Sequence, residues 1–253
     1  MLISINKTTK ALTLIVGALV LVTMLIAHFV YKSINESVDP RVVTARSLYE
    51  GYNGLAQRNA FDSVGILMNE IEGQYNAFPH YRNSYEVGVL YNNRAAAYLT
   101  MALYSDTNDY TLLIRDSLIS LSADAAQKSI GIYEEWLTKY QNKTPEEIEK
   151  IASIDFFVGL ESYDEKQQDR YFNRRIKEII TAQEETLRRL SVSYTNMGIV
   201  YRYRQQYEMA AKQYKTAFEL WDENLVAENN LNILFNKPLR ERSFIQKIFP
   251  PKK

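Results

Sequence analysis

The sequence predicts an all-α protein with one N-terminal transmembrane helix followed by a solenoid of α-α hairpins. Three observations predict this class. Residues 11–30 form an apolar run without a charged side chain. The rest of the 253-residue chain shows helical periodicity without alternating strand patterns, and the whole chain has only nine glycines and six prolines. Finally, residues 194–220 carry small and aromatic residues at the spacing of a paired-helix repeat.

The apolar run follows a short N-terminal tail, residues 1–10. In a helix, twenty residues span roughly 30 Å, which is the thickness of the hydrocarbon core of a bilayer. A cleaved signal peptide is the alternative, but such peptides have shorter apolar regions and a small-residue cleavage site. The sequence therefore predicts a membrane anchor at residues 11–30.

The charges that flank this run predict its orientation. Lys7 and Lys10 precede it and Lys32 follows it, which favours an N-terminus on the inside. The body is then periplasmic if the protein is bacterial. Arg41 and Arg46 weaken this bias, so a cytosolic body is the alternative.

A linker of residues 31–40, ending at a proline, leads to a predicted helical repeat domain at residues 41–236. Residues 237–253 follow as a capping segment or tail with four apolar side chains. Thr144 and Pro145 form a good helix start, with a capping hydroxyl and a proline at the first helical position. The helices are expected at 41–58, 60–74, 82–104, 109–139, 145–154, 165–204, 207–220 and 223–236.

The repeat signal is strongest near the C-terminus of this domain. Aromatic, large apolar and small residues alternate on a first helix, and alanines flank an aromatic residue on a second. These residues are Tyr194, Met197, Gly198, Tyr201, Ala210, Tyr214 and Ala217. A shift of 34 residues from Met197 and Tyr201 leads to Leu231 and Phe235. A large apolar residue and an aromatic residue thus recur at the same two places. Small residues let paired helices approach closely, while the aromatic rings fill the grooves beside them.

An earlier stretch repeats the pattern less closely, with Tyr91, Ala95 and Tyr98 in the places of Tyr194, Gly198 and Tyr201. On these residues the chain resembles the tetratricopeptide-repeat superfamily. The resemblance is specific over 191–224, partial over 88–140 and 225–236, and vague over 41–75.

The resemblance implies a right-handed stack of helical hairpins with a concave face that binds a partner protein. Asn93, Asn196 and Asn230 share one place on successive first helices, and in that superfamily this place often faces the groove. An amide side chain both donates and accepts hydrogen bonds, so a column of amides suits the backbone of an extended peptide. The alternative is that each asparagine makes only local bonds or meets solvent.

A second pattern lies on the long helix expected at 165–204. Apolar residues recur there at alternating steps of four and three, and they include Ile176, Ile180, Leu187 and Leu190. This seam packs either inside the molecule, for example against 109–139, or against a second copy in a homodimer.

The composition favours a non-catalytic protein. The chain has no cysteine and two histidines, which excludes thiol chemistry and multi-histidine metal sites. Its formal net charge is zero, which argues against nucleic acid as a partner. We expect no cofactor, no bound metal and no catalytic residue.

These patterns predict a single-pass membrane protein whose repeat domain binds a peptide or helix of another protein in its groove. The alternative is a structural subunit of a membrane complex that oligomerises through the helix at 165–204. An enzyme with an unfamiliar helical active site is a third option, and no recognisable constellation of residues favours it.

Overall fold

The computed structural model describes residues 7–104 and 112–242. Within these ranges the protein is all-helical, without a strand. The helices are α1 (Lys7–Glu36), α2 (Val43–Gln57), α3 (Phe61–Asn76), η1 (Pro79–Tyr81), α4 (Tyr85–Tyr104), α5 (Leu112–Tyr140), α6 (Pro145–Ala152), α7 (Glu165–Tyr203), α8 (Tyr207–Leu220) and α9 (Leu225–Leu234).

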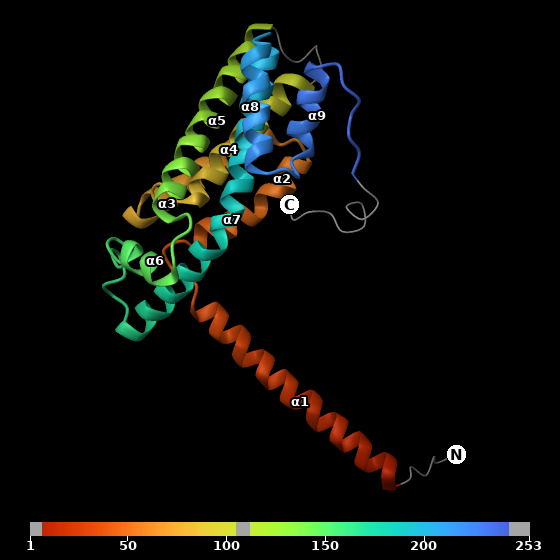
Figure 1. Ribbon diagram of the computed structural model, residues 1–253. Coiled ribbons are helices and arrows are strands. Elements are labelled where there is room, and N and C mark those ends of the chain that lie inside the picture. The colour runs from red at the N-terminus through yellow and green to blue at the C-terminus, as the bar shows by residue number, and fades with distance from the viewer. Residues whose placement is uncertain (1–6, 105–111, 243–253) are drawn as a thin grey trace.

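α1 projects alone from the helical body (Figure 1). Its window Ile15–Lys32 has a mean hydropathy of 2.0, and none of that window is buried. It is the one helix in the described part of the chain that is long and apolar enough to cross a membrane.

The segment between α1 and α2 differs from the predicted linker at 31–40. α1 continues to Glu36, and the turn after it contains two buried charged residues, Asp39 and Arg41. A flexible linker would leave such charges in water. The turn that follows α1 is therefore packed into the body.

The body is built from helices that pair with their neighbours in sequence (Figure 1). α2 packs on α3, α4 on α5 and α7 on α8, while α3 also contacts α4. The 39-residue helix α7 lies against both α4 and α5, and α9 packs on α8 and touches α7. Each later helix pair thus rests on the pair before it.

Glycines mark the closest crossings of two of these pairs. Gly198 of α7 faces the ring of Tyr214 of α8, and a Cβ at Gly198 would overlap the Cε1 atom of that ring. Gly88 of α4 makes the same contact with Tyr133 of α5, where an added Cβ would lie only 2.5 Å from the Cε1 atom of the ring. The sequence comparison aligned Ala95 with Gly198, whereas the structure places Gly88 in the equivalent contact. Gly88 and Ala95 lie seven residues, or two turns, apart on one helix face, which explains the shift.

Most residues predicted to pack the repeats lie in or against the core. Fully buried or nearly so are Ala95, Met197, Gly198, Ala210, Tyr214 and Ala217. Partly buried are Tyr91, Tyr98, Tyr194, Tyr201 and Leu231. Phe235 is different, because it is 59% exposed. α9 ends at Leu234, one residue before it, so Phe235 lies beyond the packed helix.

Two predicted segments fall partly outside the described residues. The N-terminal tail 1–10 is described only from Lys7 onward, as the first turn of α1. The C-terminal segment 237–253 is described up to residue 242, without helix, and its apolar residues Phe244, Ile245, Ile248 and Phe249 lie outside the described residues.

Candidate functional site

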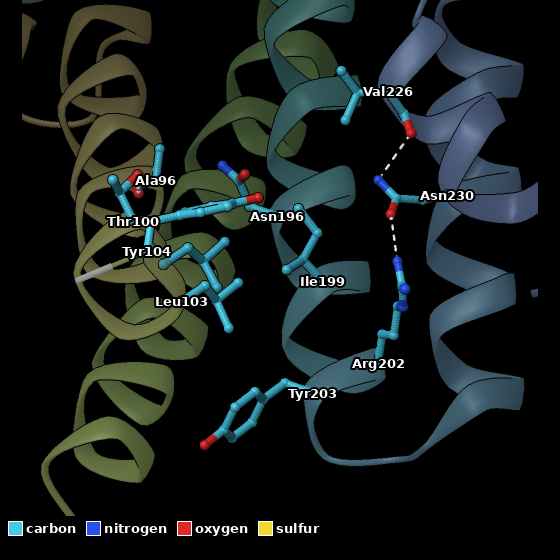
Figure 2. Close-up of a pocket in the computed structure, with 11 residues that line it drawn as sticks. Ala96, Thr100, Leu103, Tyr104, Asn196, Ile199, Arg202, Tyr203, Val226 and Asn230 are labelled. Carbon is cyan, nitrogen blue, oxygen red and sulfur yellow. Dashed lines mark hydrogen bonds between the residues drawn. The ribbon is translucent and has the colours of Figure 1, made fainter. Parts of the chain in front are cut away.

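A groove runs across the first helices of two successive helix pairs, α4 and α7, and across α9, which follows the second pair. Its cavity measures about 530 Å³. Residues of α4, α7 and α9 line it, and Figure 2 shows how their side chains face the gap between these helices. The lining residues are Ala96, Leu99, Thr100, Leu103, Tyr104, Asn196, Ile199, Arg202, Tyr203, Val226 and Asn230.

The lining combines open apolar surface with a single charged side chain. Tyr104 is 82% exposed at one side of the groove and Val226 is 58% exposed at the other. Between them, Arg202 donates from Nη1 to Oδ1 of Asn230 over 3.0 Å, and Asn230 donates from Nδ2 to the carbonyl of Val226 over 2.9 Å (Figure 2). The Arg202 guanidinium also interacts with the hydroxyl of Tyr214. Within the described residues it forms no ion pair with a carboxylate, so its positive charge is not neutralised at the groove.

The three predicted amides do not form one column in this groove. Asn230 lies at the rim, but Asn196 is only 7% exposed and donates to Oδ1 of Asn92 over 3.0 Å. Asn93 lies outside the groove, where its Nδ2 donates to the hydroxyl of Tyr49 over 2.9 Å. All three amides thus make hydrogen bonds within the molecule; the bond from Asn230 to Val226 is local, whereas Asn93 and Asn196 bond to side chains of other helices.

Asn92 is the residue that the sequence comparison missed. Its Oδ1 accepts from Asn196 and from the hydroxyl of Ser193, which is 2.8 Å from the hydroxyl of Ser129. Ser129 in turn donates to the carbonyl of Gly88 over 2.9 Å. This chain of buried polar groups joins α4, α5 and α7 and sets their register, because a shifted helix would leave these groups unpaired. A signal was present, since Asn92 lies four residues after Gly88 and so shares its face of α4.

Most residues of the apolar seam predicted on α7 pack against other helices of the same molecule. Ile176 and Leu190 are buried, at 9% and 3% exposure, and Leu187 is partly buried against the same core. Only Ile180, at 38% exposure, remains open. The seam therefore packs against the protein's own helices, and it offers no continuous apolar stripe to a second copy.

A network of buried charges lies near the start of α7, distant in sequence from the groove residues. Arg175 is 2% exposed, and its Nη1 donates to Glu86 over 2.5 Å. Burial alone would raise the pKa of Glu86, but the charge and hydrogen bonds of Arg175 outweigh it and lower that pKa to about 2. Glu178 pairs with both Arg175 and Arg46 of α2. Its Oε2 lies 2.7 Å from Nη2 of Arg46. These pairs tie α7 to α4 and α2.

His80 belongs to the same network. Its Nδ1 is 2.7 Å from a carboxylate oxygen of Asp155, and its Nε2 accepts from Nε of Arg175 over 3.1 Å. Burial lowers the pKa of His80 below its ordinary value, and the hydrogen bond to Asp155 only partly offsets this. A neutral imidazole satisfies both contacts, because one ring nitrogen donates and the other accepts. Both nitrogens are thus engaged, and neither is free to move a proton for a substrate.

The turn after α1 is held by a second buried pair. Arg41 donates to both carboxylate oxygens of Asp39, and its Nη1 reaches the carbonyls of Phe156 and Val158 over 2.5 Å. The hydroxyl of Tyr81 donates to Asp39 over 2.9 Å. Burial would raise the pKa of Asp39, but the Arg41 bonds and charge lower it overall. The turn after α1 is thereby joined to η1 and to the segment between α6 and α7.

Within the described ranges, no group of three or more His, Cys, Asp or Glu side chains is arranged to hold a metal ion. No family model, curated protein or solved structure matches this chain. Among the cavities of the described residues, the groove on α4, α7 and α9 combines exposed apolar side chains with one arginine and joins three helices, which makes it the candidate site.

Proposed function

We propose that this protein is a membrane-anchored, non-catalytic interaction module. Its tetratricopeptide-like body binds a segment of another protein in the groove of α4, α7 and α9. α1 confines the resulting complex to the bilayer. The observation that carries this proposal is the groove itself, a cavity lined by α4, α7 and α9 with exposed apolar side chains at Tyr104 and Val226.

The packing of the helix pairs supports the repeat-like part of the proposal. The first helices of two pairs, α4 and α7, each carry a glycine against a tyrosine of the second helix. α9, which follows α8, stands where the first helix of a further pair would begin. The three first helices face the groove together, as in a solenoid whose concave surface is its binding surface.

The chemistry of the lining suggests the class of partner. Exposed apolar atoms of Tyr104 and Val226 favour apolar side chains. The guanidinium of Arg202, bonded to a neutral amide, favours a carboxylate, which it can bind with two hydrogen bonds. We therefore propose a short partner segment that carries an acidic residue beside apolar residues. The amide of Asn230 holds Arg202 in place for this contact.

We also propose the side of the membrane on which the body lies. The lysines before residues 11–30 favour an inside N-terminus and a translocated body, which is periplasmic in a bacterium. A partner would then be met on that side of the membrane.

Photo-crosslinking in intact membranes tests the proposal. A photoreactive amino acid replaces Thr100 in the groove, and the matched control replaces Lys212 on the exposed face of α8. We expect a discrete protein adduct from position 100 that is absent from position 212. Identical adduct patterns at both positions, or none at position 100, would contradict a groove-bound partner.

A further inference from the structure

The two contacts of His80 fix the position of its ring proton. Its Nε2 lies 3.1 Å from Nε of Arg175, and a guanidinium nitrogen can only donate, so Nε2 is the acceptor. The ring proton is therefore on Nδ1, which donates to Asp155 over 2.7 Å. The side chain of His80 is only 2% exposed. The folded protein thus holds this imidazole as one neutral tautomer, and Nε2 cannot take up a proton while the contact with Arg175 persists.

The elements around His80 contribute several other charged or titratable side chains. They are Asp155 after α6, Arg175 on α7, Glu86 on α4, Glu135, Lys139 and Tyr140 on α5, Tyr81 and Arg82 beside His80 itself, and Asp39 and Arg41 in the turn after α1. Histidine is the only residue type among them that ordinarily changes charge between about pH 5 and pH 8. Burial alone would raise the pKa of Asp155 and that of Glu86, but their contacts with His80 and Arg175 outweigh it and lower both. In mildly acidic solution the change of charge therefore falls on His80.

Protonation of Nε2 turns a hydrogen-bond acceptor into a donor. Two N–H groups of like charge, one on His80 and one on Arg175, would then face each other at hydrogen-bond distance. Arg175 is held on its other side by Glu86, over 2.5 and 3.3 Å. His80 is held by Asp155, which lies in the non-helical segment between α6 and α7 and has a 30% exposed side chain. The pair of His80 and Asp155 is therefore the part that moves away.

The turn after α1 depends on the chain neighbours of this pair. The hydroxyl of Tyr81, next to the histidine, donates to Asp39 over 2.9 Å. The carbonyl of Phe156, next to the aspartate, accepts from Nη1 of Arg41 over 2.5 Å. A movement of the pair away from α7 displaces both supports of the buried ion pair in this turn.

We propose that His80 is an acid-sensitive latch between the body and the turn after α1. At neutral pH the latch is closed, and in mildly acidic solution a proton on Nε2 separates His80 from Arg175 and frees the turn. Opening becomes more favourable below about pH 6.5, the ordinary pKa of histidine, because the open form binds a proton that the closed form excludes. This inference depends neither on the groove nor on a partner.

Hydrogen–deuterium exchange of the full chain in detergent, measured by mass spectrometry, tests the latch. Two peptides, covering residues 37–46 and 153–160, report on the turn and on the segment that holds it; a peptide from α8 is the internal control. Exchange is compared at pH 7.5 and pH 5.5, with labelling times adjusted for the chemical pH dependence of amide exchange. His80→Gln is the matched variant, because glutamine keeps one donor and one acceptor but cannot take up a proton.

We expect the protection of both latch peptides to fall about tenfold at pH 5.5, since the opening equilibrium changes at most about tenfold per pH unit below 6.5. The α8 peptide should keep its protection, and in His80→Gln the latch peptides should keep theirs. Unchanged latch peptides in the unaltered chain, or an equal loss in α8, would overturn the inference, and neither outcome depends on how the variant folds. The same loss in His80→Gln would overturn it as well.

Discussion

At the scale of single residues, two glycines set how closely the helices of two pairs approach. Gly198 and Gly88 lie against the rings of Tyr214 and Tyr133, and both tyrosines are fully buried. A side chain at either glycine must displace a ring that has no free space around it.

We predict that Gly198→Ala lowers the free energy of unfolding by about 1–3 kcal/mol, because the added methyl overlaps the Tyr214 ring. Urea unfolding of the full chain in detergent, followed by circular dichroism, measures the change. The matched control is Gly131→Ala on α5, where nothing lies within 4 Å of the added methyl. It should be neutral or stabilising by up to about 1 kcal/mol. Equal effects at the two glycines would contradict the close crossing.

The sequence predicts the Gly198 contact but not its counterpart in the earlier pair. Sixteen positions separate Gly198 from Tyr214, as the repeat spacing requires, whereas forty-five separate Gly88 from Tyr133. A fixed spacing cannot locate a contact across helices of unequal length. Asn92 was missed for a related reason, because its partners lie on α7, about a hundred residues away.

His80 makes stability depend on pH in a definite direction. Its pKa is lowered in the folded protein, so between that value and the ordinary 6.5 the unfolded chain binds a proton that the folded chain does not. We predict that stability is fully present above about pH 6.5 and falls as the pH decreases below it, by at most about 1.4 kcal/mol per pH unit. The pKa of Asp155 and that of Glu86 are lowered as well, so their contributions are lost only in more acidic solution.

Urea titrations between pH 5.0 and 7.5 measure this slope, with His80→Gln as the comparison. The variant should lose most of the slope in that window. If it keeps the slope of the unaltered chain, the titrating group is not His80.

At the scale of elements, α7 connects the buried charge network with the groove. Its first half carries Arg175 in the buried charge network, and its second half carries Arg202 in the groove. The helices themselves were well predicted, with 207–220 matching α8 and 165–204 matching α7 within one residue. The charge network was not predicted, because its members come from separate segments around residues 41, 80, 86, 155 and 175 that only the fold brings together.

We predict that Arg175→Met destabilises the protein by about 3–5 kcal/mol, because it leaves the buried carboxylate of Glu86 unpaired. The double change Arg175→Met with Glu86→Leu should cost clearly less, since it removes both charges. Lys215→Met, which breaks an exposed pair with Glu219, is the control and should cost less than about 1 kcal/mol. Urea unfolding compares the three, and a double variant as unstable as Arg175→Met alone would show that Glu86 is not its main partner.

At the scale of the whole molecule, one buried and one exposed contact connect the end of α1 and the turn after it to the body. Arg41 links the exit of α1 to Phe156 and Val158, and Arg170 pairs with Glu36 at 3.3 Å. The sequence predicted a helix apolar enough to span a membrane, but not the buried contacts of the turn after it, since the apolar run ends before Glu36.

We predict that Leu19→Arg together with Val22→Arg releases the protein from membranes, because each arginine costs about 3 kcal/mol at the centre of a spanning helix. Alkaline carbonate extraction measures the release. Val43→Arg, at an exposed position of α2, should leave the protein in the membrane fraction. Retention of the double variant would contradict a spanning role for α1.

The measurement that tests the central claim most directly is partner capture by groove variants of the full chain in native membranes. Affinity purification after crosslinking compares the unaltered chain with Arg202→Glu and with the control Lys212→Glu. Reversing the charge at Arg202 should reduce the recovered partner about tenfold or more, while the control retains it. Equal recovery with both variants would show that proteins bind this chain without using the groove of α4, α7 and α9.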